Sequence, residues 1–242
     1  MAQYALDRVL SVAGTDAVKG NVIFLADQIV DPSLAFTSET EDIVDAMNNV
    51  VMVLENGRGA TFSASNAFFN TQILAAQVGS EVTTGATEIT KYDILTLGEG
   101  GVATLSATPK GTDAKIYTLA KDGSLTTAKA ATGTIAEGKV TVANGTKDSK
   151  VLVVYTAEVT AEEKISAFAD AKNKLMNVTA EVLLKELCNE ELYYAYIVMK
   201  GKLNGEAEWG MSRDSQHAFE IRCFPEYCGD KKLVDVIIVK GE

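Results

Sequence analysis

The segment Val50–Ser65, with the sequence VVMVLENGRGATFSAS, carries the clearest structural signal in the chain. Val50–Leu54 is an unbroken apolar run, and Ala60–Ser65 is a second strand-like run. Between them lies Asn56-Gly57, a pair that strongly favours a β-hairpin because both residue types tolerate a positive φ. The segment therefore predicts two antiparallel strands, with the turn at Asn56–Gly59.

Residues 66–78, directly after this hairpin, form the best candidate helix. Phe69, Ile73 and Ala76 fall at positions i, i+4 and i+7, so on a helix they gather into one apolar stripe. Asparagine and serine can cap the first turn of a helix, and glycine often follows the last turn. The candidate caps are Asn66 and Ser65 at the start, and Gly79 follows the end.

The remaining segments favour strands. Before the hairpin, residues 21–26 and 34–37 are strand-like, with a break at Asp31-Pro32-Ser33, and the acidic stretch 38–48 predicts a loop or a short exposed helix. In the last third, two segments fit either a strand or a helix, and three favour strands. The ambiguous segments are 179–187 and 192–199, and the strand-like ones are 200–209, 217–224 and 233–239. With no β-α-β rhythm, the chain is expected to be mainly β and antiparallel.

The composition changes over residues 98–149, where 30 of 52 residues are Ala, Gly, Ser or Thr. Short β runs alternate with turn signals across this stretch. We expect a long β-hairpin or small β insert, presented outward from a core built by residues 1–97 and 150–242. The β runs are 102–105, 115–119 and 139–142, followed by 151–155, and the turn signals are 109–111, 122–123 and 144–145.

The charge balance restricts the function. The 242 residues carry 33 acidic and 22 basic side chains, a formal net charge of -11, and the apolar fraction of 47% is large enough for a globular core. An acidic chain is poorly suited to holding a nucleic acid backbone, which requires clustered Lys and Arg. One His and three Cys supply little for metal or nucleophilic chemistry.

Sequence motifs for nucleotide binding and hydrolysis are also missing. Gly98, Gly100 and Gly101 precede a strand pattern rather than a helix, so they do not form a phosphate loop. Near His217, no Gly-x-Ser-x-Gly elbow surrounds a serine, and a polar turn entering a strand is the simpler interpretation. The residues of that apparent triad are Ser212, Asp214, Ser215 and His217.

The other chemistry-bearing residues also favour structural roles. Cys223 and Cys228 are not a Cys-x-x-Cys pair, and with Cys188 they are expected to be reduced and mostly buried, although a disulfide across 223–228 remains possible. Trp209 is most simply a packing residue. Paired carboxylates are expected to be solvated, namely Glu162-Glu163 and Glu190-Glu191. We therefore assign no catalytic, cofactor-binding or metal site.

The N-terminal residues Met1–Arg8 lack the basic start and long apolar run of a signal peptide. The longest apolar run, Val50–Leu54, is far shorter than a membrane span. We expect synthesis and folding in a cytoplasm, without membrane association.

The order of these segments resembles the tail tube proteins of long-tailed bacteriophages. The resemblance covers nearly the whole chain and is one of layout rather than of invariant residues. The matching stretches are 21–37; 51–63 running into 68–75; 105–109 with 151–156; and 197–238, where Ala207-Glu208-Trp209 leads to Phe219-Glu220-Ile221.

This resemblance implies a β-sandwich or half-barrel flanked by a helix that covers the core with Phe69 and Ile73. It further implies rings of six subunits whose sheets join into one inner β-barrel. Such rings stack into a tube in the virion tail, guided by a tape measure protein, and DNA passes through the tube without specific binding. Further implied partners are a tail sheath and tail terminator or baseplate proteins. The 98–149 insert is expected to reach a neighbouring ring or a sheath.

Three other functions compete with a tail tube subunit. A capsid-associated decoration protein would use the same kind of β fold. An adhesion or carbohydrate-binding module would use the Thr-rich insert as its binding face, although the missing signal peptide counts against it. An enzyme of a new type is disfavoured by the single His and the absence of motifs.

Overall fold

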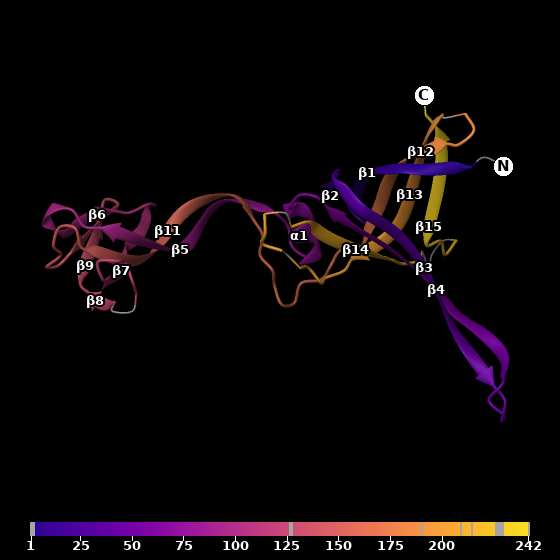
Figure 1. Ribbon diagram of the computed structural model, residues 1–242, viewed down its shortest axis with the longest axis horizontal. Helices are drawn as coiled ribbons and strands as arrows, with labels where there is room; N and C mark the ends of the chain where they lie inside the picture. Colours follow the sequence, from indigo (N-terminus) through magenta and orange to yellow (C-terminus); the bar gives the residue numbers. More distant parts are fainter. Residues whose placement is uncertain are drawn as a thin grey trace. The chain divides into compact units, whose positions relative to one another are not determined.

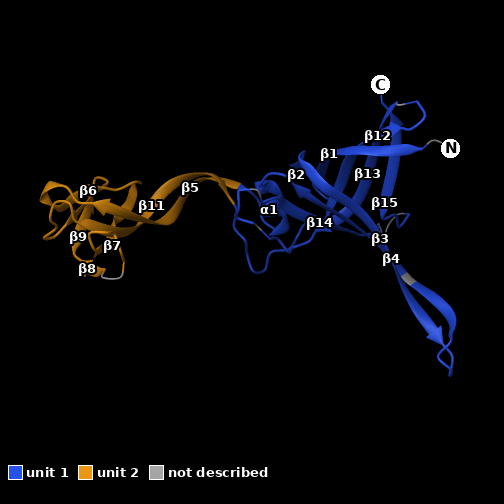
Figure 2. Ribbon diagram, in the orientation of Figure 1, with its two compact units in different colours: residues 1–82, 165–242 blue, residues 83–164 orange. Residues whose placement is uncertain are grey.

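The computed structural model describes residues 3–125, 128–189, 191–208, 210–213, 215–225 and 230–241. It confirms a mainly β fold with one α-helix among the described residues. The chain forms two compact units: unit 1 comprises residues 1–82 and 165–242, and unit 2 comprises residues 83–164 (Figure 2). Five residues named above lie outside the described ranges, so the predictions for them stay predictions: Met1, Trp209, Asp214, Cys228 and Glu190.

Unit 1 is built on an eight-stranded antiparallel sheet with the order β2-β1-β12-β13-β14-β4-β3, in which β15 also pairs with β13 (Figure 1). The alternation predicted near residue 217 is confirmed, because every second side chain of β14 is buried. The two ambiguous segments are both strands. The bounds are β1 Tyr4–Asp16, β2 Val22–Ala26, β3 Ile29–Val44, β4 Val50–Asn66, β12 Met176–Glu186, β13 Leu192–Leu203, β14 His217–Cys223 and β15 Val234–Lys240.

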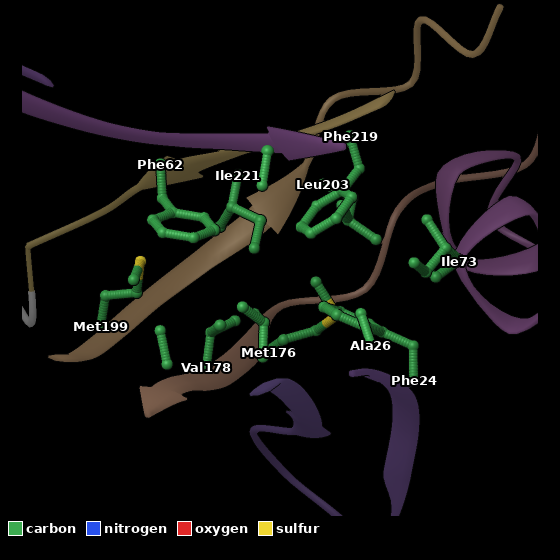
Figure 3. Packing of buried hydrophobic residues seen from close by; sticks show 14 of the residues in the cluster. Phe24, Ala26, Phe62, Ile73, Met176, Val178, Met199, Leu203, Phe219 and Ile221 are labelled. Atoms are coloured by element: carbon green, nitrogen blue, oxygen red, sulfur yellow. The ribbon is translucent and has the colours of Figure 1, made fainter. Parts of the chain in front are cut away.

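The core of unit 1 lies mainly between strands of this sheet, with β4 and β14 on one side and β1, β2 and β12 on the other, and the helix α1 (Thr71–Gln77) adds Ile73 and Ala76 (Figure 3). Figure 3 shows Phe62, Phe219 and Ile221 facing the methionines of β12 and β13, with Ile73 approaching from α1. The rings of Phe24 and Phe219 meet edge to face, with centroids 6.0 Å apart. Each fully buried side chain of this size stabilises the fold by about 1.5–3 kcal/mol, so this cluster determines how unit 1 folds.

The helix α1 is shorter than the predicted 66–78 and has a different cap. Asn70 is the N-cap, and its Oδ1 accepts hydrogen bonds from the N–H groups of Gln72 at 3.0 Å and Ile73 at 3.1 Å. The predicted cap Asn66 instead ends β4, where its Nδ2 donates to the carbonyl of Phe68. Pairing of β4 with β14 extends to Asn66 and delays the helix by one turn.

The predicted hairpin within residues 50–65 was wrong, because both predicted runs belong to the single strand β4, which continues through Asn56-Gly57 and pairs with β3. Of the segment 38–48, expected to be a loop or short helix, residues 38–44 belong to β3, and the turn of the observed hairpin lies at residues 45–49. Glu39 pairs with Gly57 and the next residue pairs with Glu55, so Asn56 is the extra residue of a β-bulge. Long-range pairing with β3 therefore overrides the local Asn-Gly turn preference, and Gly57 does not adopt a positive φ.

Unit 2 has its own core and extends beyond the predicted insert 98–149 on both sides. A four-stranded sheet, β5-β11-β7-β8, faces a three-stranded sheet, β6-β10-β9, around buried Ile116, Val140 and Val153. The predicted turn at Pro109–Gly111 is part of β7 instead. The bounds are β5 Thr83–Thr96, η1 Glu99–Gly101, β6 Val102–Thr104, β7 Pro109–Thr118, β8 Lys129–Ala131, β9 Gly133–Ala136, β10 Lys139–Val142 and β11 Lys150–Lys164.

Candidate assembly surfaces

The strand β15 lies at an edge of the unit 1 sheet, where one side of the strand is available for pairing. In the described part of the chain it pairs with β13 alone, from Val234 opposite Met199 to Lys240 opposite Tyr193. Its centre, Val236–Val239, is a run of large apolar residues that are between 44% and 57% exposed. A long apolar edge strand presents free N–H and C=O groups and readily accepts another strand.

The opposite edge of the same strands is also open. β1, β12, β13 and β15 lie in this order, and β2 pairs with β1 only from Val12 to Thr15. Tyr4–Ser11 of β1 therefore have a strand partner on the β12 side alone, as far as the described residues show. One subunit thus offers two free antiparallel edges, one at each side of a four-stranded segment.

The second candidate surface is the distal hairpin, defined as residues 37–59 of β3 and β4. β14 pairs with β4 only from Thr61 to Asn66, so the distal hairpin is a two-stranded ribbon. Its large apolar side chains are exposed on both faces, and an isolated two-stranded ribbon is only marginally stable in water. These exposed residues are Ile43, Val44, Met47, Val50, Val51, Met52, Val53 and Leu54.

The tip of the distal hairpin is an ordered turn. The Oδ1 atom of Asp45 accepts hydrogen bonds from the N–H groups of Met47 at 2.8 Å and Asn49 at 2.9 Å. The bonds from the Asn49 N–H, the Asn49 side-chain amide and the Met47 N–H all favour the carboxylate and lower the pKa of Asp45 below its ordinary value. The turn therefore holds its shape without help from a neighbour.

Among the described residues near His217, the side chains of His217 and Ser215 have other partners and are not hydrogen-bonded to each other. The His217 ring is buried, its Nε2 lies 2.9 Å from the Oε1 of Gln77, and its Nδ1 accepts from the N–H of Asn70 at 3.4 Å. Gln77 Nε2 donates to the carbonyl of Ala218, which leaves Oε1 as the acceptor for His217. Ser215 instead donates its hydroxyl hydrogen to the Ser212 carbonyl at 3.0 Å. Burial lowers the pKa of His217, so the ring is neutral and joins α1 to β14.

The other candidate chemistry is also structural. Cys223 is buried as expected, whereas Cys188 is exposed, and both are free thiols. The glycines 98, 100 and 101 form a 3₁₀ turn that leads into β6, in agreement with the sequence interpretation. No group of three or more His, Cys, Asp or Glu within the described ranges has a metal-binding arrangement.

Buried polar groups in unit 2 serve its own fold. Asp93 accepts hydrogen bonds from the Ser106 N–H at 2.8 Å, the Ser106 hydroxyl at 2.6 Å and the Tyr155 hydroxyl at 2.9 Å. Burial opposes the charged form, but these donors outweigh it and hold the pKa of Asp93 below its ordinary value. The network fastens the β6–β7 connection to the four-stranded sheet.

The sequence interpretation missed both surfaces as sites. The apolar run at 50–54 was assigned to an ordinary strand, although its exposure on both faces marks it as an interaction surface. The run at 236–239 carried a usable signal, because four consecutive large apolar residues in a strand require cover on both faces.

No helix within the described ranges has the length and apolar character needed to cross a membrane. A comparison with protein-family models finds that residues 5–232 match the YomU/Tube protein family. A comparison with curated proteins finds no match.

Proposed function

The chain belongs to the YomU/Tube protein family, and from this premise we propose that it is a structural subunit of a bacteriophage tail tube. Its function is assembly with copies of itself, and it has no catalytic role. The subunit is made in the host cytoplasm and ends in the virion tail. The observation that carries the proposal is the pair of open edges, β15 and Tyr4–Ser11 of β1, at the two sides of one sheet segment.

These two edges explain how a ring forms. When β15 of one subunit pairs with β1 of the next, the segments β1-β12-β13-β15 continue into one another. Each contact joins two different surfaces of the subunit. Repeated contacts of this kind produce a closed ring when the rotation between neighbouring subunits divides a full turn evenly. Six such subunits complete a ring in our proposal, and the ring encloses a channel for DNA.

The distal hairpin explains how rings stack. Its exposed apolar residues lose contact with water when they lie against a neighbouring ring, and this burial stabilises the tube. In the proposed tail, a tape measure protein sets the length, terminator and baseplate proteins close the ends, and a sheath is a further proposed partner. The net charge of -11 suits a channel that DNA passes without being held.

The proposal is tested by adding charges to β15. Ile237 and Val239 are exposed, and Lys at both positions places two charges on the edge that must pair. We expect the double variant Ile237→Lys/Val239→Lys to require at least about tenfold more protein before rings or tubes appear by negative-stain electron microscopy. Far-UV circular dichroism and the melting temperature check that the monomer still folds.

The matched control is Tyr92→Lys/Ile94→Lys, which changes two exposed apolar residues on β5 of unit 2. This control is expected to assemble like the wild type. Wild-type protein that stays monomeric at all concentrations and salt conditions would contradict the proposed function. Equal assembly of the two double variants would show that β15 is not the ring interface.

A further inference from the structure

The tip of the distal hairpin displays a large apolar side chain to solvent. Met47 is 82% exposed, although the turn around it is fixed by the hydrogen bonds of Asp45 and needs no apolar residue at that position. Asn48 follows with a φ of 63° and donates its N–H to the Asp45 carbonyl at 3.0 Å. A methionine presented from an ordered turn can enter a pocket with little loss of backbone freedom.

A cavity of about 290 Å³ lies beside α1 in unit 1. Its apolar wall includes Ile23 from β2, Ala75 and Ala76 from α1, and Met176 from β12. The small side chains of the two alanines leave this space open. The volume is at the lower end of the range for ligand pockets, so it suits one side chain and its flanking turn rather than a larger ligand. Methionine adapts well to irregular apolar pockets.

The distal hairpin is acidic, with five acidic residues and one arginine, whereas the rim of the cavity carries Lys19 and Lys174 beside Asp16 and Glu81 and is neutral overall. Of the acidic groups at the same rim, Glu81 already pairs with Lys174 at 2.6 Å, and Asp16 accepts from the N–H groups of Val18 and Lys19. The acidic residues of the hairpin are Glu39, Glu41, Asp42, Asp45 and Glu55, and Glu55 lies 3.5 Å from Arg58.

The hairpin tip and α1 lie at opposite ends of unit 1 (Figure 2). The hairpin therefore cannot reach the cavity of its own chain. A projection at one end and a matching cavity at the other form a heterologous contact, which produces an open-ended stack.

We propose that Met47 of one copy enters the cavity beside α1 of a copy in the next ring. This inference rests on the proposed function and names the receptor for the distal hairpin. The occupant is a second copy of this chain, and the bound side chain lies against the two alanines of α1 and Met176.

The test is disulfide trapping in a Cys188→Ser/Cys228→Ser background, which removes the exposed thiol of the described residues and the cysteine that lies outside them. Gln72 is an exposed residue of α1 that lines the cavity. A chain with Met47→Cys and Gln72→Cys should form a covalent ladder of copies after mild oxidation, seen on a non-reducing gel. The control combines Met47→Cys with Lys202→Cys, because Lys202 is exposed and lies outside the cavity. The control should give no more cross-linked product than a chain with either cysteine substitution alone.

A second measurement keeps the test independent of cysteine chemistry. Met47→Ser should raise the protein concentration required for tubes by about tenfold or more, whereas Met47→Leu should change it less than about threefold. Both substitutions lie on an exposed turn, so the melting temperature of the monomer should be unchanged.

The outcomes separate this inference from the proposed function. If the wild type forms stacked rings but the ladder is absent, or equals that of the Lys202 control, the cavity is not the receptor and the inference fails. Tubes of Met47→Ser at the wild-type concentration would also overturn it. If the wild type forms neither rings nor tubes, the proposed function itself fails.

Discussion

Unit 2 and the distal hairpin both rest on long antiparallel strand pairs, yet only unit 2 encloses a core. The inner face of β11 is covered, where Val151 and Val153 are fully buried, as is Val140 on β10. The distal hairpin pairs β3 with β4 over a similar length, but Val51 is 66% exposed and its neighbours are similar. Strand pairing satisfies the backbone, whereas only a second layer removes apolar side chains from water.

The difference between unit 2 and the distal hairpin indicates which part of the molecule depends on neighbouring subunits. Unit 2 also satisfies its buried polar groups internally, through the bonds of Asp93 to Ser106 and Tyr155. The distal hairpin has an ordered tip but no covering layer. We therefore expect unit 2 to behave as an independent domain and the distal hairpin to gain most of its stability on assembly.

The largest expected effect comes from removing each region in turn. Replacing residues 37–59 with Asn-Gly joins Phe36 to Ala60, which are paired in the native sheet. This variant should fold, because the core of unit 1 is untouched, but should form no tubes at any concentration tested by electron microscopy. Its melting temperature should stay within a few degrees of the wild type.

The matched excision replaces residues 84–163 with Asn-Gly. Thr83 and Lys164 are paired, so a tight turn can close the gap. Cutting at 98 and 149 instead would leave Val151 and Val153 uncovered. The excised chain should still form tubes, with a smaller loss than the hairpin variant. If the unit 2 excision impaired tube formation more than the hairpin replacement, the distal hairpin would not be the region that depends most on assembly.

A smaller and more selective effect is expected from core substitutions. Phe62→Ala should cost unit 1 about 3–5 kcal/mol, and Ile116→Ala should cost unit 2 about 2–5 kcal/mol, because each leaves a cavity in a closed core. Hydrogen exchange resolved by peptide should show each loss confined to its own unit. Loss of protection in both units from either substitution would mean that the two cores unfold together.

The smallest expected effects are those of pH, and they separate the units. Burial lowers the pKa of His217, so its contribution to unit 1 is fully present above the ordinary pKa of about 6.5 and is lost as the pH falls toward the folded value. The pKa of Asp93 is also lowered, so its contribution to unit 2 is present above the ordinary pKa of about 3.9 and is lost as the pH falls through the folded value.

Between pH 7 and about pH 5, urea unfolding should therefore show a decline for unit 1 while unit 2 stays constant. His217→Gln should flatten the unit 1 profile, and Asp93→Asn should flatten the profile of unit 2 below about pH 4. A unit 1 profile that keeps its slope in His217→Gln would assign the effect to another group.

Local patterns predicted some elements well and misplaced others. The alternation at 217–223 gave β14, because every second residue had to face the core. The helix cap was wrong because Asn66 and Asn70 are equally suitable by residue type, and the choice depends on how far β4 pairs with β14. The turn was wrong because Asn56-Gly57 fits both a tight turn and a bulge.

The sequence by itself determined that this chain is mainly β, that 217–224 and 233–239 are strand-forming, as β14 and β15 confirm to within one residue, and that its layout is that of a tube protein. Those properties follow from the periodicity of apolar residues within each segment and from the order of the segments along the chain. Only the tertiary structure decided where the hairpin turns, where unit 2 begins and ends, and which apolar residues stay exposed. These depend on pairing between distant strands, whose combined energy outweighs a preference of about 1 kcal/mol at any single turn or cap.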